Sequence, residues 1–301
     1  MRQQHIRVSL VALAAMAALA SPAMAGDEGQ QPAPPAAVAS VPPPPGWKQC
    51  PRCQNAQDRK EADAKYKVEG HPFTPRDISG VWGNQGVGAT FRTPPPFTPW
   101  GQEQFNATIG DKNAAGEPLH TKDTSGEGAG SPVNCDPKGW PRLHTYNYGF
   151  EFVVLPDRVL QFFELTHTWR TIWTDGRKLP DPPPQLQWNG WNVGRWDGNT
   201  FVVEGVGFDD RSWLSDTMPD GGFPHSDEMR VVERWRRVNY GTLEVQITVT
   251  DPKTYTKPWV TPTATIRLSP GAELWEDFCV PSDYNAFNSD VYRPVATGDK
   301  K

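Results

Sequence analysis

The feature that most constrains the fold is a series of short strand patterns separated by turn residues, which runs through residues 140–280. Its strongest turn signal is Asp197-Gly198, between the strand-like segments 192–196 and 200–207. An Asp-Gly pair between two such segments is typical of a tight two-residue hairpin. The chain from Trp140 onward is therefore expected to be mostly strand.

Two further hairpins are expected along the same part of the chain. Segments 228–238 and 242–250 flank Asn239-Tyr240-Gly241, and segments 262–268 and 273–280 flank Pro270-Gly271. Together with the earlier segments they give about nine or ten antiparallel strands and little helix. Because closure removes the unpaired edges of such a meander, the sequence predicts an all-β, antiparallel up-and-down barrel over residues 77–281. A barrel of this size can hold one small ligand.

Residues 1–25 have the pattern of an export signal. Arg2, His5 and Arg7 precede an apolar run, and Ala23-Met24-Ala25 forms a small-x-small cleavage site. The run is too short to span a membrane, and no later window reaches about 18 apolar residues. We expect a periplasmic or secreted protein with no integral membrane segment, a Pro/Ala-rich tether with a possible short helix over residues 26–76, and a tail over 282–301.

The charge balance excludes a nucleic-acid partner. Loss of the signal leaves 28 basic and 35 acidic residues, a formal charge of −7, whereas phosphate binding needs a basic stripe. The arginines of segment 230–237 alternate as in a strand, and Glu233 interrupts them, so we interpret them as a solvated sheet face.

Four cysteines in an exported chain favour disulfides, although three pairings are possible. We expect Cys135 to pair with Cys279, because one precedes the first long strand and the other ends the last. We also expect Cys50 to pair with Cys53. Their CPRC spacing is that of a redox motif, but no βαβ pattern surrounds it, so a local staple or a zinc knuckle shared with another chain is favoured.

Polar residues are concentrated between residues 158 and 180. Phe162 and Glu164 share one face of the expected strand, so a Glu164 directed inward would have a raised pKa and could act as a general acid or base. His167 is a second acid/base candidate. Arg170 and Trp169 are candidate ligand-binding residues, with Arg170 as the partner of an anionic ligand. The alternative is that Arg170 forms an ion pair with Glu164 that has a purely structural role.

A second polar group follows segment 200–207. Asp209 could orient His225 for proton transfer across the loop, with Arg211 nearby for ligand binding. The alternative is that Asp209 caps a turn through its side chain. Tryptophans are numerous, and most are expected in the core. Those close to the polar candidates, and taken here as ligand-binding, are Trp169, Trp191 and Trp213.

Known catalytic motifs are absent from the sequence. It contains no GxSxG, GxxxxGK[ST] or GxGxxG pattern in the required context, so serine-hydrolase, P-loop and Rossmann functions are not supported. His144, His167 and His225 with Glu164 offer a set of metal ligands but lack compact spacing, so metal binding is a minor alternative. We expect no cofactor and no metal.

The Gly80-Val81-Trp82 triplet on the first strand resembles the GxW signature of lipocalin-like (calycin) barrels. The wider pattern resembles a group of uncharacterised exported bacterial proteins over residues 77–279. Its motifs are DISGVW, CDPKGWPRL, THTWRTIWTDGRKLP, VGRWDGNTFVVEGVGFDDRSWL, PHSD and DPKTYTKPW. The chain departs from that group where CDPKGWPR replaces a run closer to CLPPGVPR, and Trp140 there could reshape one rim of a cavity. The resemblance implies fold and compartment rather than a reaction.

Two classes of function follow. One is a protein that binds an apolar or aromatic small molecule in its barrel. The other is a cofactor-independent acid/base enzyme, a lyase, isomerase or hydrolase, that acts on such a molecule. In either case we expect one polar site, where the segment of Glu164 and His167 meets residues 209–227. The identity of the ligand and the oligomeric state are left open.

Overall fold

The computed structural model describes residues 56–83, 87–119, 121–122, 135–216 and 221–279. The chain divides into two units, residues 1–48 and 49–301, and all the described residues belong to the second. The expected signal, the Cys50–Cys53 pair and the tail over 282–301 lie outside the described residues.

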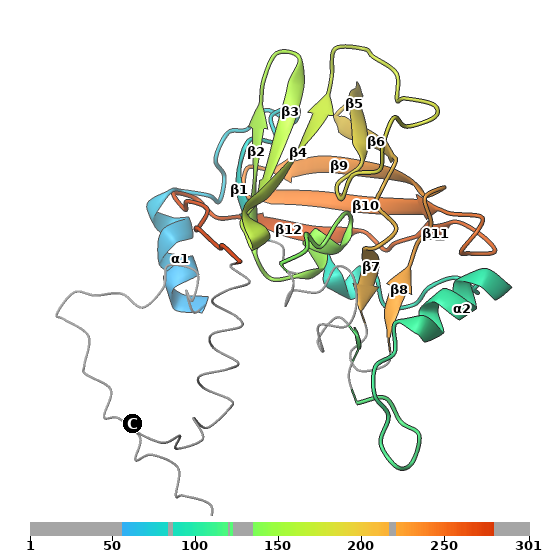
Figure 1. The fold of residues 1–301 in the computed structure, drawn as a ribbon. Coiled ribbons are helices and arrows are strands. Elements are labelled where there is room, and N and C mark those ends of the chain that lie inside the picture. The colour runs from blue at the N-terminus through green and yellow to red at the C-terminus, as the bar shows by residue number, and fades with distance from the viewer. Residues whose placement is uncertain (1–55, 84–86, 120, 123–134, 217–220, 280–301) are drawn as a thin grey trace, which may run out of the picture. The chain divides into compact units, whose positions relative to one another are not determined.

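Two α-helices and twelve strands lie within the described residues (Figure 1). The helices are α1 (Ala56–Lys65) and α2 (Pro99–Ala107). The strands are β1 (Gly80–Gly83), β2 (Gly149–Val154), β3 (Arg158–Phe163), β4 (Thr168–Trp173), β5 (Trp191–Asp197), β6 (Thr200–Val206), β7 (Trp213–Asp216), β8 (Gly222–Pro224), β9 (Arg230–Asn239), β10 (Thr242–Thr250), β11 (Trp259–Val260) and β12 (Ala264–Leu268).

Nine of the described strands close into a barrel. Their order is β1-β2-β3-β4-β5-β6-β9-β10-β12, and β12 pairs back to β1. Strand β11 pairs with the second half of β10, and β7 and β8 form a separate hairpin. Closure supplies each barrel strand with a neighbour on both sides. The predicted all-β barrel with about nine or ten strands and little helix is confirmed.

The tight turns place the neighbouring strands as the sequence predicts. Asp197 faces Thr200 across the β5–β6 turn, where Gly198 has a φ of 57°, in the left-handed region that favours glycine. Strands β9 and β10 pair along their length around the turn that ends at Gly241. In β10 the apolar residues alternate with half-buried ones, so Leu243 and every second residue after it point into the barrel.

One pair of barrel strands differs from the expected antiparallel order. Strands β4 and β5 run parallel, with Ile172 opposite Asn192. Parallel neighbours need a long crossover instead of a tight turn, and the connection over residues 174–190 supplies it. This connection includes Pro180 and the run from Pro182 to Pro184. The barrel is therefore mixed.

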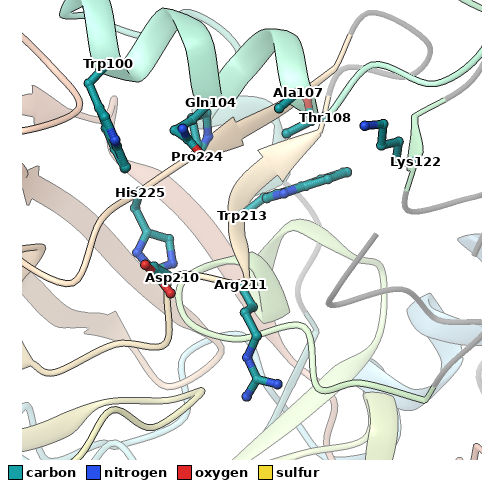
Figure 2. Close-up of a pocket in the computed structure, with 10 residues that line it drawn as sticks. All are labelled: Trp100, Gln104, Ala107, Thr108, Lys122, Asp210, Arg211, Trp213, Pro224 and His225. Carbon is teal, nitrogen blue, oxygen red and sulfur yellow. The ribbon is translucent and has the colours of Figure 1, made fainter. Parts of the chain in front are cut away.

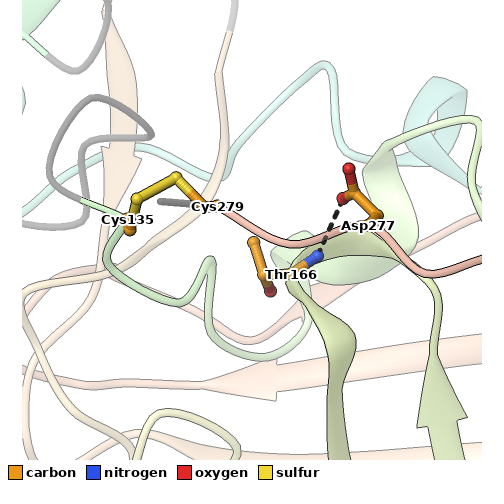
Figure 3. Close-up of a disulfide and its surroundings, with 4 residues drawn as sticks. All are labelled: Cys135, Thr166, Asp277 and Cys279. Atoms are coloured by element: carbon orange, nitrogen blue, oxygen red, sulfur yellow. Dashed lines mark hydrogen bonds between the residues drawn. A yellow bond between two sulfur atoms is a disulfide. The ribbon is translucent and has the colours of Figure 1, made fainter. Parts of the chain in front are cut away.

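The prediction of the last hairpin, between segments 262–268 and 273–280, is wrong. Residues 273–279 form no strand, and both sides of β12 are taken by β10 and β1. The segment is instead fastened at two points (Figure 3). Cys279 is bonded to Cys135, with 5.3 Å between their Cα atoms, and the Asp277 carboxylate accepts the Thr166 N–H at 3.0 Å. The predicted Cys135–Cys279 disulfide is confirmed.

Aromatic side chains fill the centre of the barrel. Trp82, Trp235, Phe150 and Phe152 are fully buried, and Trp235 stands edge-on to Phe152 with 5.2 Å between the ring centroids. The His144 ring stands edge-on to Phe150 at 4.7 Å. Pairs of this geometry each contribute about 0.5–1.5 kcal/mol beyond the burial of their area. The barrel centre is therefore occupied by the protein's own side chains.

A buried ion pair crosses this aromatic core. The Arg170 guanidinium donates two hydrogen bonds of 2.6 Å to the Glu233 carboxylate and a third of 2.8 Å to Gln161 Oε1. Trp235 Nε1 donates to the same carboxylate at 2.8 Å, and the Arg170 guanidinium lies 3.5 Å from the Trp140 ring centroid. Each charge is thus compensated by several partners, as burial requires.

Removal of the buried cation should cost much more stability than removal of an exposed one. Arg170→Met should lower the free energy of unfolding by about 3–5 kcal/mol, because Glu233 is left charged and unpaired. The matched control is Arg195→Met, which removes an exposed pair with Glu204 and should cost less than about 1 kcal/mol. Urea denaturation followed by tryptophan fluorescence measures both. A similarly small loss of unfolding free energy in both variants would show that the buried ion pair does not stabilise the core.

Candidate functional site

The residues expected to form one polar site lie in three separate places. Arg170 is inside the barrel, within the buried ion pair. His225 lines a pocket of about 200 Å³ beside α2, whereas His167 and Trp169 line a pocket of about 350 Å³ on the outer side of β3 and β4. The two pockets share no lining residue, so the two polar segments do not meet as the sequence predicts.

We call the first of these pockets the α2 pocket (Figure 2). Helix α2 forms one wall, and the β7–β8 hairpin with its flanking loops forms the others. The lining residues that bear on its chemistry are Trp100 and Gln104 of α2, Asp210, Arg211 and Trp213 at the start of β7, and His225 just after β8.

Helix α2 is fixed to the barrel through its first turn. The Thr98 hydroxyl caps the helix by accepting the Gly101 N–H at 3.0 Å. The Thr98 N–H donates to the Thr254 carbonyl at 2.9 Å, and Gly101 packs so closely that a Cβ there would collide with that carbonyl. The helix is therefore held against the turn after β10, and Trp100 and Gln104 point into the pocket.

The opposite wall is held by the Trp213 ring. Trp213 pairs with Pro224 across the hairpin, and a side chain at Gly222 would collide with the indole. The Arg142 guanidinium lies 4.9 Å from the indole centroid, a cation–π contact. Trp213 is only 7% exposed, so the ring has a fixed position at the pocket wall.

Both ring nitrogens of His225 are engaged. Nδ1 lies 3.1 Å from the Ser226 carbonyl oxygen, and Nε2 lies 2.8 Å from Ser212 Oγ. Because a carbonyl oxygen only accepts, Nδ1 carries the proton, and Nε2 is an acceptor for the Ser212 hydroxyl. The Asp209 carbonyl oxygen, 3.1 Å from Ser212 Oγ, is a second acceptor for the same hydroxyl. Burial lowers the pKa of His225 below its usual value, which favours this neutral form.

The Asp251 carboxylate links the residue after His225 to the turn that holds α2. It accepts the Ser226 N–H at 2.6 Å and the Ser226 hydroxyl at 2.8 Å, and it accepts the Thr254 hydroxyl at 2.7 Å. Ser226 follows His225, and Thr254 holds α2. One buried carboxylate therefore fixes two walls of the α2 pocket relative to each other.

Asp209 does not orient His225 as the sequence predicts. Its two carboxylate oxygens accept hydrogen bonds of 2.9 and 2.6 Å from the Arg211 side chain, and it also accepts the Arg211 N–H at 3.1 Å. The hydrogen bonds from Arg211 lower the pKa of Asp209. A neighbour two residues away thus captures this carboxylate in a turn, and the Ser226 carbonyl orients His225 in its place.

Glu164 also lies apart from the α2 pocket. Strand β3 ends at Phe163, so the alternation expected to place Glu164 on the face of Phe162 stops one residue early. The buried Glu164 carboxylate accepts the Gly149 N–H at 2.9 Å. Its expected partner Arg170 pairs instead with Glu233 of β9.

Two further residues proposed from the sequence, Trp191 and His144, contact other residues of the protein and line neither pocket. Trp191 donates its indole N–H to the Gln185 carbonyl at 2.9 Å and lines neither pocket. His144 lies in the aromatic core, 2.9 Å from Gln161, and lines neither pocket. Within the described ranges, no group of three or more His, Cys, Asp or Glu side chains could hold a metal ion.

Sequence reasoning missed several residues that build the α2 pocket. Trp100 and Gln104 are four residues apart in a helix that starts at Thr98-Pro99, so they share one helix face. This signal was present in the sequence. Ser212 was missed because its partner His225 is brought to it only by the β7–β8 hairpin.

Stability should fall as the solution becomes acidic. Burial lowers the pKa of His144 well below 6.5 and lowers that of His225. Below about pH 6.5 the unfolded chain therefore binds more protons than the folded protein, and stability present above this pH is lost as pH falls. Each histidine contributes at most about 1.4 kcal/mol per pH unit.

Urea denaturation between about pH 7.5 and pH 5.5 measures this slope. His225→Gln should make the slope shallower, whatever its effect on stability at neutral pH. An unchanged slope would contradict a buried, neutral His225.

The chain matches no protein-family model, no curated protein and no solved structure. Among the residues that the structure describes, no helix is long and apolar enough to cross a membrane. Function must therefore be inferred from the geometry of the chain's own residues.

Proposed function

We propose that this is an exported binding protein that holds a small hydroxylated aromatic molecule in the α2 pocket. The observation that carries the proposal is the combination of two tryptophans, Trp100 and Trp213, with the polar side chains of Gln104 and Asp210 around one preformed pocket. The export signal at residues 1–25 supports the periplasmic or secreted location.

The aromatic walls favour a ring. Trp100 is half-buried and Trp213 is almost fully buried, so an aromatic ligand can contact indole surface that is already in place. The pocket volume of about 200 Å³ sets the size, since a cavity of roughly 150 Å³ holds benzene. One six-membered ring with small substituents fits this space.

The polar side chains favour hydroxyl groups on that ring. Within the described residues, neither the Gln104 amide nor the Asp210 carboxylate makes a side-chain hydrogen bond, and both line the pocket. A carboxylate accepts hydroxyl protons, and an amide can donate or accept. Two cationic side chains, Lys122 and Arg211, also line the pocket, and Arg211 is already paired with Asp209.

The α2 pocket replaces the barrel interior as the ligand site. The interior contains the Arg170–Glu233 pair and the buried rings of Trp82, Trp140 and Trp235. A ligand there would have to displace packed side chains, whereas the α2 pocket is preformed and open to one.

The acid/base enzyme is the second candidate, and the Ser212–His225 hydrogen bond favours it. A serine bonded to a histidine base is the arrangement of an activated nucleophile. However, Ser212 is 1% exposed, and a Cβ at the adjoining Gly139 would collide with its hydroxyl. A substrate in the pocket therefore has no path to this oxygen without rearrangement, which is why we favour binding.

Catechol should bind to the protein, and Trp100→Ala should weaken its binding about tenfold, or roughly 1.4 kcal/mol. The matched control is Gln102→Ala on the same helix, because Gln102 is exposed and bonded to Asn106. Isothermal titration calorimetry measures both. Cyclohexane-1,2-diol, which has the hydroxyls without the aromatic ring, should bind more weakly than catechol. Equal affinities for the two probes, or for the two variants, would refute the aromatic site.

Chromatography of catechol after long incubation separates the two candidate functions. A binding protein returns the probe unchanged. Conversion by the wild-type protein that is lost in Ser212→Ala would favour the enzyme instead.

A further inference from the structure

The second pocket lies on the outer face of β2, β3 and β4, and we call it the outer-face pocket. Glu151 of β2 is directly opposite Phe162 of β3, and Phe162 is directly opposite Trp169 of β4. These three side chains point away from the barrel interior, because their neighbours Phe163 and Arg170 point into it. With Leu274 they line a pocket of about 350 Å³.

Among the described residues that line this pocket, Glu151 is the only acidic one. It is half-buried and has no hydrogen bond or ion pair with any described residue. No lysine or arginine in the described part of the chain lines the pocket. A carboxylate in partly apolar surroundings gains from a nearby cation, since screening by water is reduced there.

Two tryptophans on the outer face of β4, Trp173 and Trp169, differ in their contacts with cations. Trp173 points outward from β4 like Trp169, and its ring is contacted by the Arg158 and Arg177 guanidinium groups at 4.0 and 3.5 Å. Trp169 is 60% exposed, and no cation of the described residues lies over its ring. A cation–π contact contributes about 0.5–2 kcal/mol, depending on how far the cation is desolvated.

The fastened segment over residues 273–279 forms another wall. Leu274 lines the pocket, and the His167 ring packs on Phe278 with 4.7 Å between centroids. The Asp277 hydrogen bond and the disulfide at Cys279 hold this segment (Figure 3). The wall is therefore in place before a ligand arrives, which lowers the entropic cost of binding.

We propose that the outer-face pocket binds a small organic cation with an apolar body. The ammonium group lies between the Glu151 carboxylate and the Trp169 ring, and the apolar body packs on Phe162 and Leu274. This site is independent of the α2 pocket, and its ligand class differs in charge.

Titration with benzyltrimethylammonium, followed by calorimetry, tests the proposal. The probe should bind, and Glu151→Gln and Trp169→Leu should each weaken binding about tenfold. Benzylsulfonate, with the same ring and opposite charge, should not bind, and tetramethylammonium, without the ring, should bind at least tenfold more weakly. Glu228→Gln is the control for loss of one exposed negative charge, and it should leave the affinity unchanged.

The variant Trp100→Ala tests whether the outer-face pocket binds its ligand independently of the α2 pocket. It should leave benzyltrimethylammonium binding intact while it weakens catechol binding. No measurable binding of the cation, equal binding of benzylsulfonate, or unchanged affinity in Glu151→Gln would overturn the proposal. Leu274→Ala should weaken binding severalfold with an unchanged circular-dichroism spectrum, and an unaffected affinity would show that the fastened segment is not part of the site.

Discussion

The buried pair of Arg170 and Glu233 is the constraint on which the rest of the barrel depends. Two opposite charges inside an apolar barrel are tolerated only with several close partners. Gln161, Trp140 and Trp235 supply those contacts, and each is fully buried. The strands that carry these residues must therefore keep one register, and the centre of the barrel is committed to the protein's own side chains.

Because the barrel interior is packed, the two pockets lie outside it. The α2 pocket is built where a helix and a hairpin meet the barrel, and Asp251 fixes its walls through Ser226 and Thr254. The outer-face pocket is built on three barrel strands and closed by a segment that a disulfide fastens. The barrel positions both pockets. Residues outside the strand ring supply the polar groups of the α2 pocket, whereas Glu151 and Trp169 of the outer-face pocket lie on barrel strands.

Local chemistry made part of this structure predictable. The turns at Asp197-Gly198 and Asn239–Gly241 fix their hairpins through neighbouring residues. The pairing of Cys135 with Cys279 was predicted correctly, although the assumption that Cys279 ends a strand was wrong. The other partners that are distant in the sequence were not predictable. Segment 230–237 was interpreted as a solvated face, which holds for Arg230, Arg234 and Arg236. It is wrong for Arg237 and Glu233, which are buried, and the partner of Glu233 is 63 residues away.

The difference between local and long-range information also explains why the predicted single polar site is wrong. Nothing local distinguishes an Asp209 that orients a histidine from one that Arg211 captures, and the two histidine segments were assigned to one site because both are rich in polar residues. The parallel β4–β5 pair likewise depends on tertiary pairing rather than on its own residues.

The central claim is that ligands bind outside a filled barrel, and the indole N–H signals of the 13 tryptophans test it most directly. Two-dimensional ¹H–¹⁵N spectra with and without saturating catechol are compared after assignment. The signals of Trp100 and Trp213 should shift, whereas those of Trp82, Trp140 and Trp235 should stay in place. Shifts confined to the three interior tryptophans would contradict the account.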